Sequence, residues 1–202
     1  MPRLPGGLTA EAVEAAVRDR YGQVAANPSQ DFTFPVGREF AEAVGYPADL
    51  LAGLPREAAD AFAGVACPVP HAGLAAGETV VDLGCGAGLD SLFAGTRVGP
   101  GGRVIGIDFA PAMIARAQRS FTAAAMPWVE ARLSDGHCLP PANASADAVI
   151  VNGIFNLNPD KAMLLSEAFR VLKPGGRLVA AEIILTSPLP PDEGHSLDDW
   201  FR

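Results

Sequence analysis

A buried strand that opens into a glycine-rich turn constrains this chain more than any other part of its sequence. Residues 80–88 read VVDLGCGAG, an apolar run with an acid near its end and a glycine at every second position after it. A second acid, Asp108, stands twenty residues after Gly88, at the end of the apolar run 104–107. This pairing is typical of a nucleoside-binding crevice at the carboxyl ends of parallel strands.

The spacing of the glycines distinguishes between two kinds of nucleoside. Gly84, Gly86 and Gly88 form the pattern G-x-G-x-G, whereas dinucleotide sites carry G-x-G-x-x-G and hold a pyrophosphate at a helix N-terminus. S-adenosylmethionine has no phosphate, and its amino-acid tail must lie close along bare backbone. The turn therefore favours S-adenosylmethionine, and a nicotinamide-dependent oxidoreductase is the weaker alternative.

Length, charge and cysteine usage narrow the class further. The chain has 202 residues, a hydrophobic content of 49% and a net charge of −8 without any basic run. These values predict one domain with a full core and argue against nucleic acid or an acidic membrane surface as a partner. The three cysteines are scattered, without a C-x-x-C pair, and no apolar stretch is long enough to span a bilayer. We therefore expect a cytoplasmic protein without disulfides or a metal site.

The periodicity of apolar residues changes near residue 70. Before it the pattern is helical, with helices predicted at 9–26, 38–44, 47–53 and 55–63, the first capped by Thr9. After it strands and helices alternate, with strands predicted at 78–83, 103–108, 127–133, 147–152 and 177–185, and helices at 88–97, 111–121 and 159–172. Alternation of this kind predicts a parallel sheet with crossover helices. We therefore predict an α/β fold with an N-terminal helical cap, 1–70, and a Rossmann-like domain, 71–202.

Turn residues support these boundaries. Pro111 and Pro159 suit the first turns of their helices, and Asn158 is a good N-cap for the last one. Residues 173–176, Lys-Pro-Gly-Gly, are expected to close that helix and turn the chain into strand five.

Several motifs make the chain resemble the class I S-adenosylmethionine-dependent methyltransferases, and within them the arsenite-methyltransferase-like group. In chain order these motifs are residues 20–22 (RYG), 80–91 (VVDLGCGAGLDS), 102–108 (GRVIGID), 111–115 (PAMIA), 156–161 (NLNPDK) and 169–176 (FRVLKPGG). The resemblance extends from about Val17 to Leu185. It implies a class I methyltransferase sheet and methyl transfer from S-adenosylmethionine to a small-molecule acceptor.

The resemblance also implies roles for individual residues. Asp82 would lie near the methionyl ammonium, Asp108 would accept both ribose hydroxyls, and Asp135 would accept from the adenine amino group. The other residues expected to contact the cofactor are Gly84, Cys85, Gly86, Gly88, Phe109, Met113, Gly136, His137 and Asn152. Met113 can equally be an ordinary core residue, and His137 can equally be a solvated loop residue.

No residue is singled out as a general base. Displacement from a sulfonium has a good leaving group, so a base is needed only when the acceptor must lose a proton. His137, Glu182 and Asp31 are the candidates, and Glu182 can equally be a solvated acid at a strand end.

The cysteines bear on the question of arsenic. Trivalent arsenic prefers converging thiolates. The resemblance implies one thiol at the position of Val65 and another at the position of Gly153, and this chain has neither. We therefore predict an acceptor other than arsenite, a small organic molecule, and keep arsenite methylation as the less favoured alternative.

The strand pattern ends after five strands. Complete members of the group carry two further strands, which form a hairpin beside strand five. Without them the domain is expected to be truncated at its C-terminus, with apolar residues such as Leu178 and Ile183 on an exposed edge. The chain is then an enzyme with this edge covered by a homo-oligomer, or a non-catalytic cofactor-binding module that needs a partner.

Overall fold

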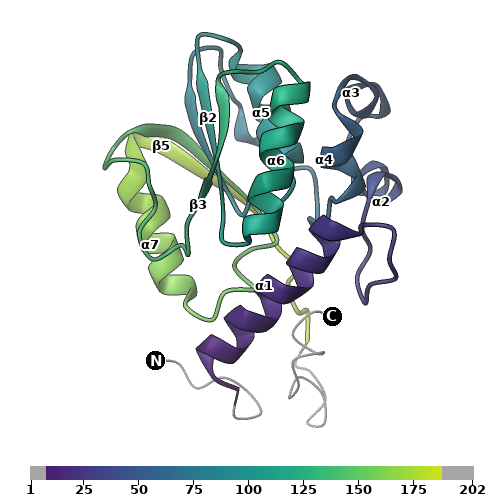
Figure 1. Ribbon diagram of the computed structural model, residues 1–202. Helices are drawn as coiled ribbons and strands as arrows, with labels where there is room; N and C mark the ends of the chain where they lie inside the picture. The colour runs from purple at the N-terminus through teal and green to yellow at the C-terminus, as the bar shows by residue number, and fades with distance from the viewer. Residues whose placement is uncertain (1–7, 188–202) are drawn as a thin grey trace.

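The computed structural model describes residues 8–187 and contains one parallel sheet of five strands in the order β3-β2-β1-β4-β5 (Figure 1). The strands are β1 (Thr79–Leu83), β2 (Arg103–Asp108), β3 (Val129–Leu133), β4 (Ala146–Asn152) and β5 (Leu172–Ala181). The chain builds outward from β1 to β3 and then crosses to the other side of β1 for β4. This reversal leaves a crevice outside the carboxyl ends of β1 and β4, where α/β folds bind their ligands.

Helices cover both faces of the sheet because successive strand residues point to opposite sides. One face packs against α5 (Leu89–Val98) and α6 (Pro111–Ala123), and its strand residues are Val80, Val104, Val129, Ala148 and Ile150. The other face packs against α7 (Lys161–Val171), and its strand residues are Val81, Leu83, Ile105, Ile107, Val149 and Val151. The strands are therefore apolar on both sides, as expected for buried parallel strands.

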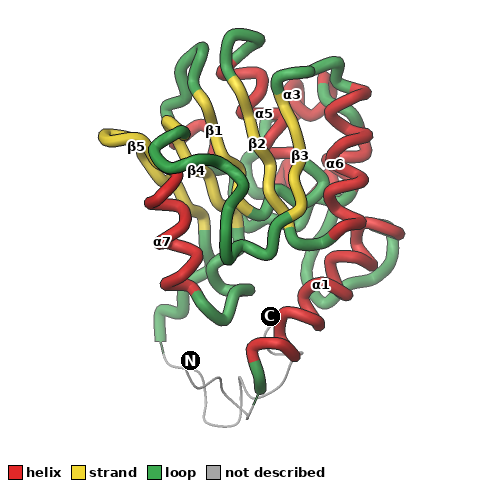
Figure 2. Tube along the Cα trace, turned by 60° about the vertical axis from the view of Figure 1, so that its left-hand side comes forward, coloured by secondary structure: helices red, strands yellow, loops and turns green. Residues whose placement is uncertain are grey.

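The N-terminal part is helical, as predicted. Its elements are α1 (Ala10–Ala26), α2 (Arg38–Ala43), α3 (Ala48–Gly53), α4 (Arg56–Asp60) and the short 3₁₀ helix η2 (Val69–Ala72). Thr9 caps α1, since its hydroxyl accepts from the Ala12 backbone N–H at 3.2 Å. In Figures 1 and 2, α1 lies across the end of the sheet where β2 and β3 finish. The helices of this region therefore lie beside the crevice.

The predicted α/β class is confirmed, and three local expectations were wrong. β5 begins at Leu172, directly after α7, and ends at Ala181 rather than at residue 185. Its pairing with β4 jumps from Ala146↔Leu172 to Ala148↔Arg177, so residues 173–176 form a bulge within the strand rather than a turn before it.

The start of α7 was also predicted wrongly. The N-cap is Asp160, whose carboxylate accepts from the Met163 N–H at 3.0 Å. Asn158 instead accepts from the Asp160 N–H at 2.7 Å, so it forms a turn just before the helix.

Two further expectations concern membranes and the C-terminus. None of the helices between residues 8 and 187 is long and apolar enough to cross a bilayer. The stretch 188–202, with its Trp200-Phe201 pair, lies outside the described residues. The boundary at residue 70 stays a prediction.

Candidate functional site

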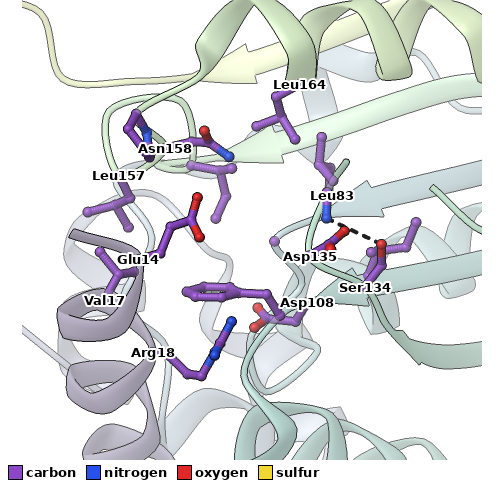
Figure 3. A pocket seen from close by; sticks show the side chains of 16 residues that line it. Glu14, Val17, Arg18, Leu83, Asp108, Ser134, Asp135, Leu157, Asn158 and Leu164 are labelled. Carbon is purple, nitrogen blue, oxygen red and sulfur yellow. Dashed lines mark hydrogen bonds between the residues drawn. The ribbon is translucent and has the colours of Figure 1, made fainter. Parts of the chain in front are cut away.

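Two adjoining pockets open at the carboxyl ends of the strands, each enclosing about 600 Å³ including open solvent. The β3-side pocket lies between α1, the loop after β3 and the loop after β4 (Figure 3). The turn pocket lies between the glycine-rich turn, residues 61–64 and the end of β4. The residues that line both pockets are Val17, Gly84, Asp108, Phe109, Ile154 and Leu157. The two pockets therefore adjoin along these shared residues.

The glycine-rich turn has three glycines in left-handed conformations, with φ of 79° at Gly84, 51° at Gly86 and 91° at Gly88. A Cβ on Gly84 would collide with Ile154, and one on Gly88 would collide with Phe121 of α6. A Cβ on Gly86 would have no atom within 4 Å. Gly84 and Gly88 are therefore required by the packing of the protein itself, and only Gly86 faces open space.

Asp108 connects the turn to the end of β2. Its Oδ2 accepts from the Gly86 N–H and its Oδ1 accepts from the Ala110 N–H, both at 2.9 Å. Burial raises the pKa of Asp108, and these hydrogen bonds oppose the rise. Each oxygen can accept a second hydrogen bond, and Asp108 lines both pockets. It is therefore available to a pair of hydroxyl donors.

Asp82 of β1 and Asp90 in the first turn of α5 lie close together, but only one of them reaches a pocket. Asp82 is 1% exposed, accepts from the Ser91 hydroxyl at 2.6 Å and lines neither pocket. Asp90 lines the turn pocket and accepts from the Tyr46 hydroxyl at 2.5 Å and from the Asn152 amide at 2.9 Å. Burial raises the pKa of Asp90 to about 6. For Asp82, burial and then the charge of Asp90 raise the pKa well above its ordinary value.

Within residues 8–187 these three buried carboxylates have no cationic partner. The described partners of Asp82, Asp90 and Asp108 are hydroxyl, amide and backbone N–H groups, and none of them is a lysine or arginine. A buried carboxylate without a cation is costly, which is why burial is the first cause of all three raised pKa values. The site therefore suits a ligand that carries positive charge.

The loop after β3 forms the far wall of the β3-side pocket, with Asp135 opposite α1 in Figure 3. Its carboxylate accepts from the His137 N–H at 3.0 Å, and Gly136 lines the same pocket. His137 is exposed and lines neither pocket.

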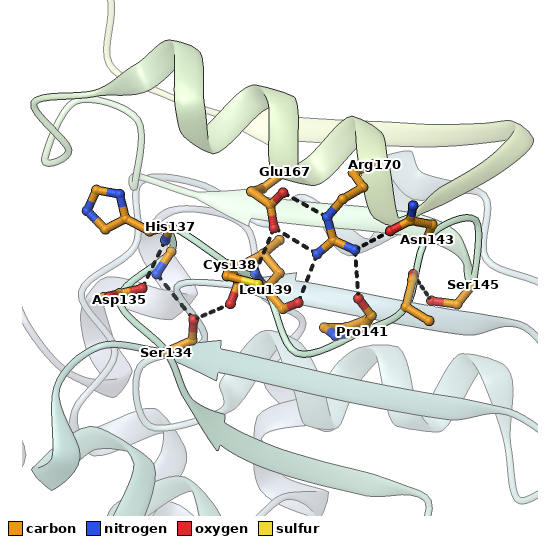
Figure 4. Close-up of polar contacts among 12 residues, drawn as sticks. Ser134, Asp135, His137, Cys138, Leu139, Pro141, Asn143, Ser145, Glu167 and Arg170 are labelled. Carbon is orange, nitrogen blue, oxygen red and sulfur yellow. Dashed lines mark hydrogen bonds and ion pairs between the residues drawn. The ribbon is translucent and has the colours of Figure 1, made fainter.

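The continuation of this loop is braced by α7 (Figure 4). Arg170 donates to the carbonyl oxygens of Leu139 and Pro141, and Glu167 accepts from the Leu139 N–H at 2.8 Å. The Arg170 guanidinium lowers the pKa of Glu167, so the pair stays ionised and holds the loop in place.

The side of the site nearest α1 is aromatic and apolar. Tyr21 and Met113 line the turn pocket, and Phe109 lines both pockets with the Arg18 guanidinium 5.5 Å from its ring centre. Burial is the main cause of the raised pKa of Tyr21, so its hydroxyl stays protonated. Met113 is 1% exposed and belongs to a core cluster with Val24, so it is both a core residue and a pocket wall.

Asn152 ends β4 and fixes a neighbouring segment of chain. Its Oδ1 accepts from the Val65 N–H at 2.8 Å, and its Nδ2 donates to the Ala66 carbonyl at 2.8 Å. A Cβ on Gly153 would lie 3.3 Å from Val65 Cγ1. The two positions at which the resemblance implies thiols are therefore in contact, and they carry a valine and a glycine.

The remaining candidate bases lie outside the pockets. Glu182 accepts from the Phe155 N–H at 2.7 Å, and its Oε2 is buried without a hydrogen-bond partner among the described residues. Glu182 and Asp31 line neither pocket. Within residues 8–187 no group of three or more His, Cys, Asp or Glu side chains is arranged to hold a metal ion.

Sequence reasoning missed several pocket residues. They are Glu14, Arg18, Phe62, Gly64, Asp90, Ile154 and Leu157. Of these, only Asp90 could have been identified from the sequence. It is a second acid within the motif at residues 80–91, and it lies in the first turn of α5.

A parallel sheet with a glycine-rich turn and acid-lined pockets at its switch point defines a class I methyltransferase fold. Residues 74–202 match the family model described as a methyltransferase domain. That match covers more than half of the chain, which therefore belongs to the class I S-adenosylmethionine-dependent methyltransferase family, in its arsenite-methyltransferase-like group.

Similar proteins differ in the acceptors that their names state. An arsenite methyltransferase of Halobacterium salinarum is 36% identical over 197 residues, which cover 90% of this chain and 50% of that protein. A demethylmenaquinone methyltransferase of Lactococcus lactis is 36% identical over 126 residues, or 62% of this chain and 49% of that protein. The crystal structure of an arsenic(III) S-adenosylmethionine methyltransferase of Chlamydomonas reinhardtii superposes with a TM-score of 0.58 and 31% identity, covering 77% of this chain and 52% of that one. The chain spans about half the length of the curated relatives it matches.

Proposed function

We propose that this chain binds S-adenosylmethionine and transfers its methyl group to a small organic acceptor other than arsenite. The observation that carries the proposal is the set of buried carboxylates, Asp82, Asp90 and Asp108, which have no cationic partner among the described residues. Asp90 and Asp108 line the turn pocket together with Gly86. S-adenosylmethionine supplies a methyl group on a positively charged sulfur and also carries an ammonium, so its charges complement this site.

Each part of this cofactor can be assigned to residues of one of the two pockets. Asp108 would accept from the ribose hydroxyls, and Asp135 with Gly136 would receive the adenine in the β3-side pocket. Gly86 and Cys85 would lie beside the amino-acid tail in the turn pocket. His137 has no role in this arrangement, because it lines neither pocket.

The protein's own contribution to methyl transfer would be to bind, to orient and to exclude water. The wall formed by Phe62 and Leu157, together with Ile154 over the glycine-rich turn, is apolar and keeps water from the centre of the site. Glu182 holds the loop after β4 through the Phe155 N–H and lines no pocket. We therefore assign no obligatory general base to Glu182, His137 or Asp31.

The contact between Val65 and Gly153 supports the exclusion of arsenite. A thiolate site needs sulfur atoms that converge on the metalloid. Cys67 is buried, and burial raises its pKa to about 12, which leaves it as a protonated thiol at neutral pH. Arsenite methylation in the presence of added thiols should therefore be absent, and a sustained rate would refute this part of the proposal.

Calorimetric titration with S-adenosylhomocysteine tests cofactor binding directly. The wild-type chain should bind it, and Asp108→Asn should weaken binding by at least tenfold, because one charge-assisted hydrogen bond is lost. Circular dichroism of the variant checks that it is folded. The proposal fails if the wild-type chain shows neither heat nor a thermal shift at millimolar ligand.

A second candidate function is a cofactor-binding module that needs a partner. It is supported by exposed apolar side chains on α7 and after β5, among them Phe169 and Ile184, which are 81% and 79% exposed. In this case the isolated chain would bind S-adenosylhomocysteine but turn over no acceptor until the partner is added.

A cytoplasmic location remains a proposal, supported by Cys67, Cys85 and Cys138 being free thiols.

A further inference from the structure

We infer that Asp90, rather than Asp82, receives the ammonium group of the cofactor's amino-acid tail and so selects for that tail. The inference rests on the proposed function, since it assigns one end of the same ligand. It replaces the role that the sequence resemblance gave to Asp82.

Asp82 is enclosed by the protein. It is 1% exposed, and its carboxylate accepts from the Ser91 hydroxyl in the first turn of α5. It lines neither pocket. A ligand ammonium could reach it only if α5 moved, so Asp82 is not placed to contact the ligand.

Asp90 lines the turn pocket, and side chains from two separate segments fix its carboxylate. The Tyr46 hydroxyl donates to Oδ1, and the Asn152 amide donates to Oδ2. Asn152 is itself held by the backbone of Val65 and Ala66. Each carboxylate oxygen still has the capacity to accept another hydrogen bond, so the group is preorganised for one more donor.

The position of Asp90 fits the order of the ligand's parts. Asp108 accepts from the Gly86 N–H in the middle of the glycine-rich turn, and Asp90 follows Gly88, where the turn ends. Gly86 lines the turn pocket together with both acids, and an added Cβ there would meet no atom within 4 Å. A nucleoside held at Asp108 would therefore extend its tail past Gly86 toward Asp90.

The chemistry of Asp90 points to a cation. Its described partners are a neutral hydroxyl and a neutral amide, and burial raises its pKa to about 6. A positive group in the pocket would offset the cost of keeping this carboxylate ionised. The positive end of the amino-acid tail meets that requirement.

The test compares two ligands that differ only in the tail, S-adenosylhomocysteine and 5′-methylthioadenosine. Asp90→Asn should weaken binding of S-adenosylhomocysteine at least tenfold and change binding of 5′-methylthioadenosine less than twofold. The matched control is Asp82→Asn, which should affect the two ligands equally. Binding is measured by calorimetry at neutral pH, with circular dichroism to verify the fold of each variant.

Several outcomes would overturn the inference while leaving the proposed function intact. They are an equal loss for both ligands in Asp90→Asn, or a selective loss in Asp82→Asn. If the wild-type chain binds neither ligand, the proposed function itself fails. If Asp90→Asn does not fold, Tyr46→Phe replaces it, because it removes one hydrogen-bond donor to Asp90. This variant should still weaken the binding of S-adenosylhomocysteine more than that of 5′-methylthioadenosine. An equal effect on the binding of both ligands would count against Asp90.

Discussion

At the scale of single residues, the site combines negative charge with burial before any ligand is present. Asp82, Asp90 and Asp108 are at most 8% exposed and have no lysine or arginine partner among the described residues. The folded protein therefore carries an energetic cost at its binding site. Binding of a cation relieves that cost, so stability and ligand affinity are linked through the same side chains.

This linkage predicts how the stability of the ligand-free protein depends on pH. Because the pKa of Asp90 is raised to about 6 from its ordinary value of 3.8, the folded state holds a proton that the unfolded state releases. Its contribution to the free energy of unfolding is therefore complete below pH 4 and is lost as pH rises through about 6. The midpoint of thermal unfolding should fall between pH 5 and pH 7.

The control for this prediction is Asp90→Asn, in which the fall between pH 5 and pH 7 should be smaller. Carboxylates with lowered pKa values, such as Glu78 and Asp147, act in the opposite sense and at lower pH. They lose their stabilising contribution only as pH falls to about 4 and below. An unchanged slope in Asp90→Asn would show that other groups set the pH dependence.

Two glycine substitutions should separate folding from binding. Gly88→Ala places a methyl group against Phe121 in a left-handed conformation and should destabilise the fold by about 3 kcal/mol. Gly86→Ala meets open space and should cost about 1 kcal/mol of stability from its backbone conformation alone. The main effect of Gly86→Ala should be to weaken the binding of S-adenosylhomocysteine, on the order of tenfold. Urea unfolding and calorimetry measure the two effects, and equal destabilisation by both variants would contradict the assignment.

The placement of some of these residues was predictable from the sequence. Asp108 and the glycine-rich turn follow from spacing alone, because they lie at the ends of neighbouring strands. Asp90 and Asp82 could not be ranked, because the difference depends on contacts with Tyr46 and Asn152, which are 44 and 62 residues from Asp90 in the chain. Nothing in the local sequence encodes those contacts.

At the scale of elements, Arg116 of α6 attaches the N-terminal helices to the sheet domain. It is 9% exposed and donates to the Glu57 carbonyl at 2.7 Å and to the Ala25 carbonyl at 2.9 Å. One turn earlier on α6, Met113 forms part of the turn pocket. The same helix therefore holds both the N-terminal region and a wall of the site.

Arg116→Met should destabilise the protein by about 2–4 kcal/mol, because two charge-assisted hydrogen bonds are lost and two carbonyl groups are left without them. Hydrogen exchange should quicken in α1 and α4 more than in the sheet. Arg119→Met is the matched control, since its ion pair with Glu57 is exposed and worth at most about 1 kcal/mol. Uniform faster exchange across the chain in Arg116→Met would argue against a local attachment.

The order of the elements was predictable from periodicity, and their ends were less so. Pro111 does begin α6, as its fixed φ suggests. The bulge at residues 173–176 was mistaken for a turn, because Pro-Gly-Gly reads the same in both settings. Only the pairing with β4 shows that the strand has already begun at Leu172.

At the scale of the whole molecule, the β5 side of the described structure exposes several large apolar side chains. β5 is the outermost strand on that side, and α7 packs against it. The exposed apolar side chains of α7, β5 and the residues that follow are Leu165, Phe169, Leu178, Ile183, Ile184 and Leu185. An outer strand with apolar neighbours favours association.

We therefore expect the isolated chain to self-associate. Sedimentation velocity should show an increase in mean mass with concentration, and Phe169→Glu should reduce it by placing a charge on that surface. Leu133→Glu is a suitable control, since Leu133 is 55% exposed on β3 at the opposite edge of the sheet. A monomer at all concentrations, or equal effects of the two variants, would refute association through this side.

The contact between Val65 and Gly153 has a consequence for substitutions at either position. These positions belong to segments that are distant in sequence, yet Asn152 holds them against each other beside the site. Relatives of this chain bear names stating acceptors as different as arsenite and demethylmenaquinone. Because the two positions are neighbours in space although distant in the chain, substitutions at both would change the same spot beside the site, while the strands and the glycine-rich turn stay as they are.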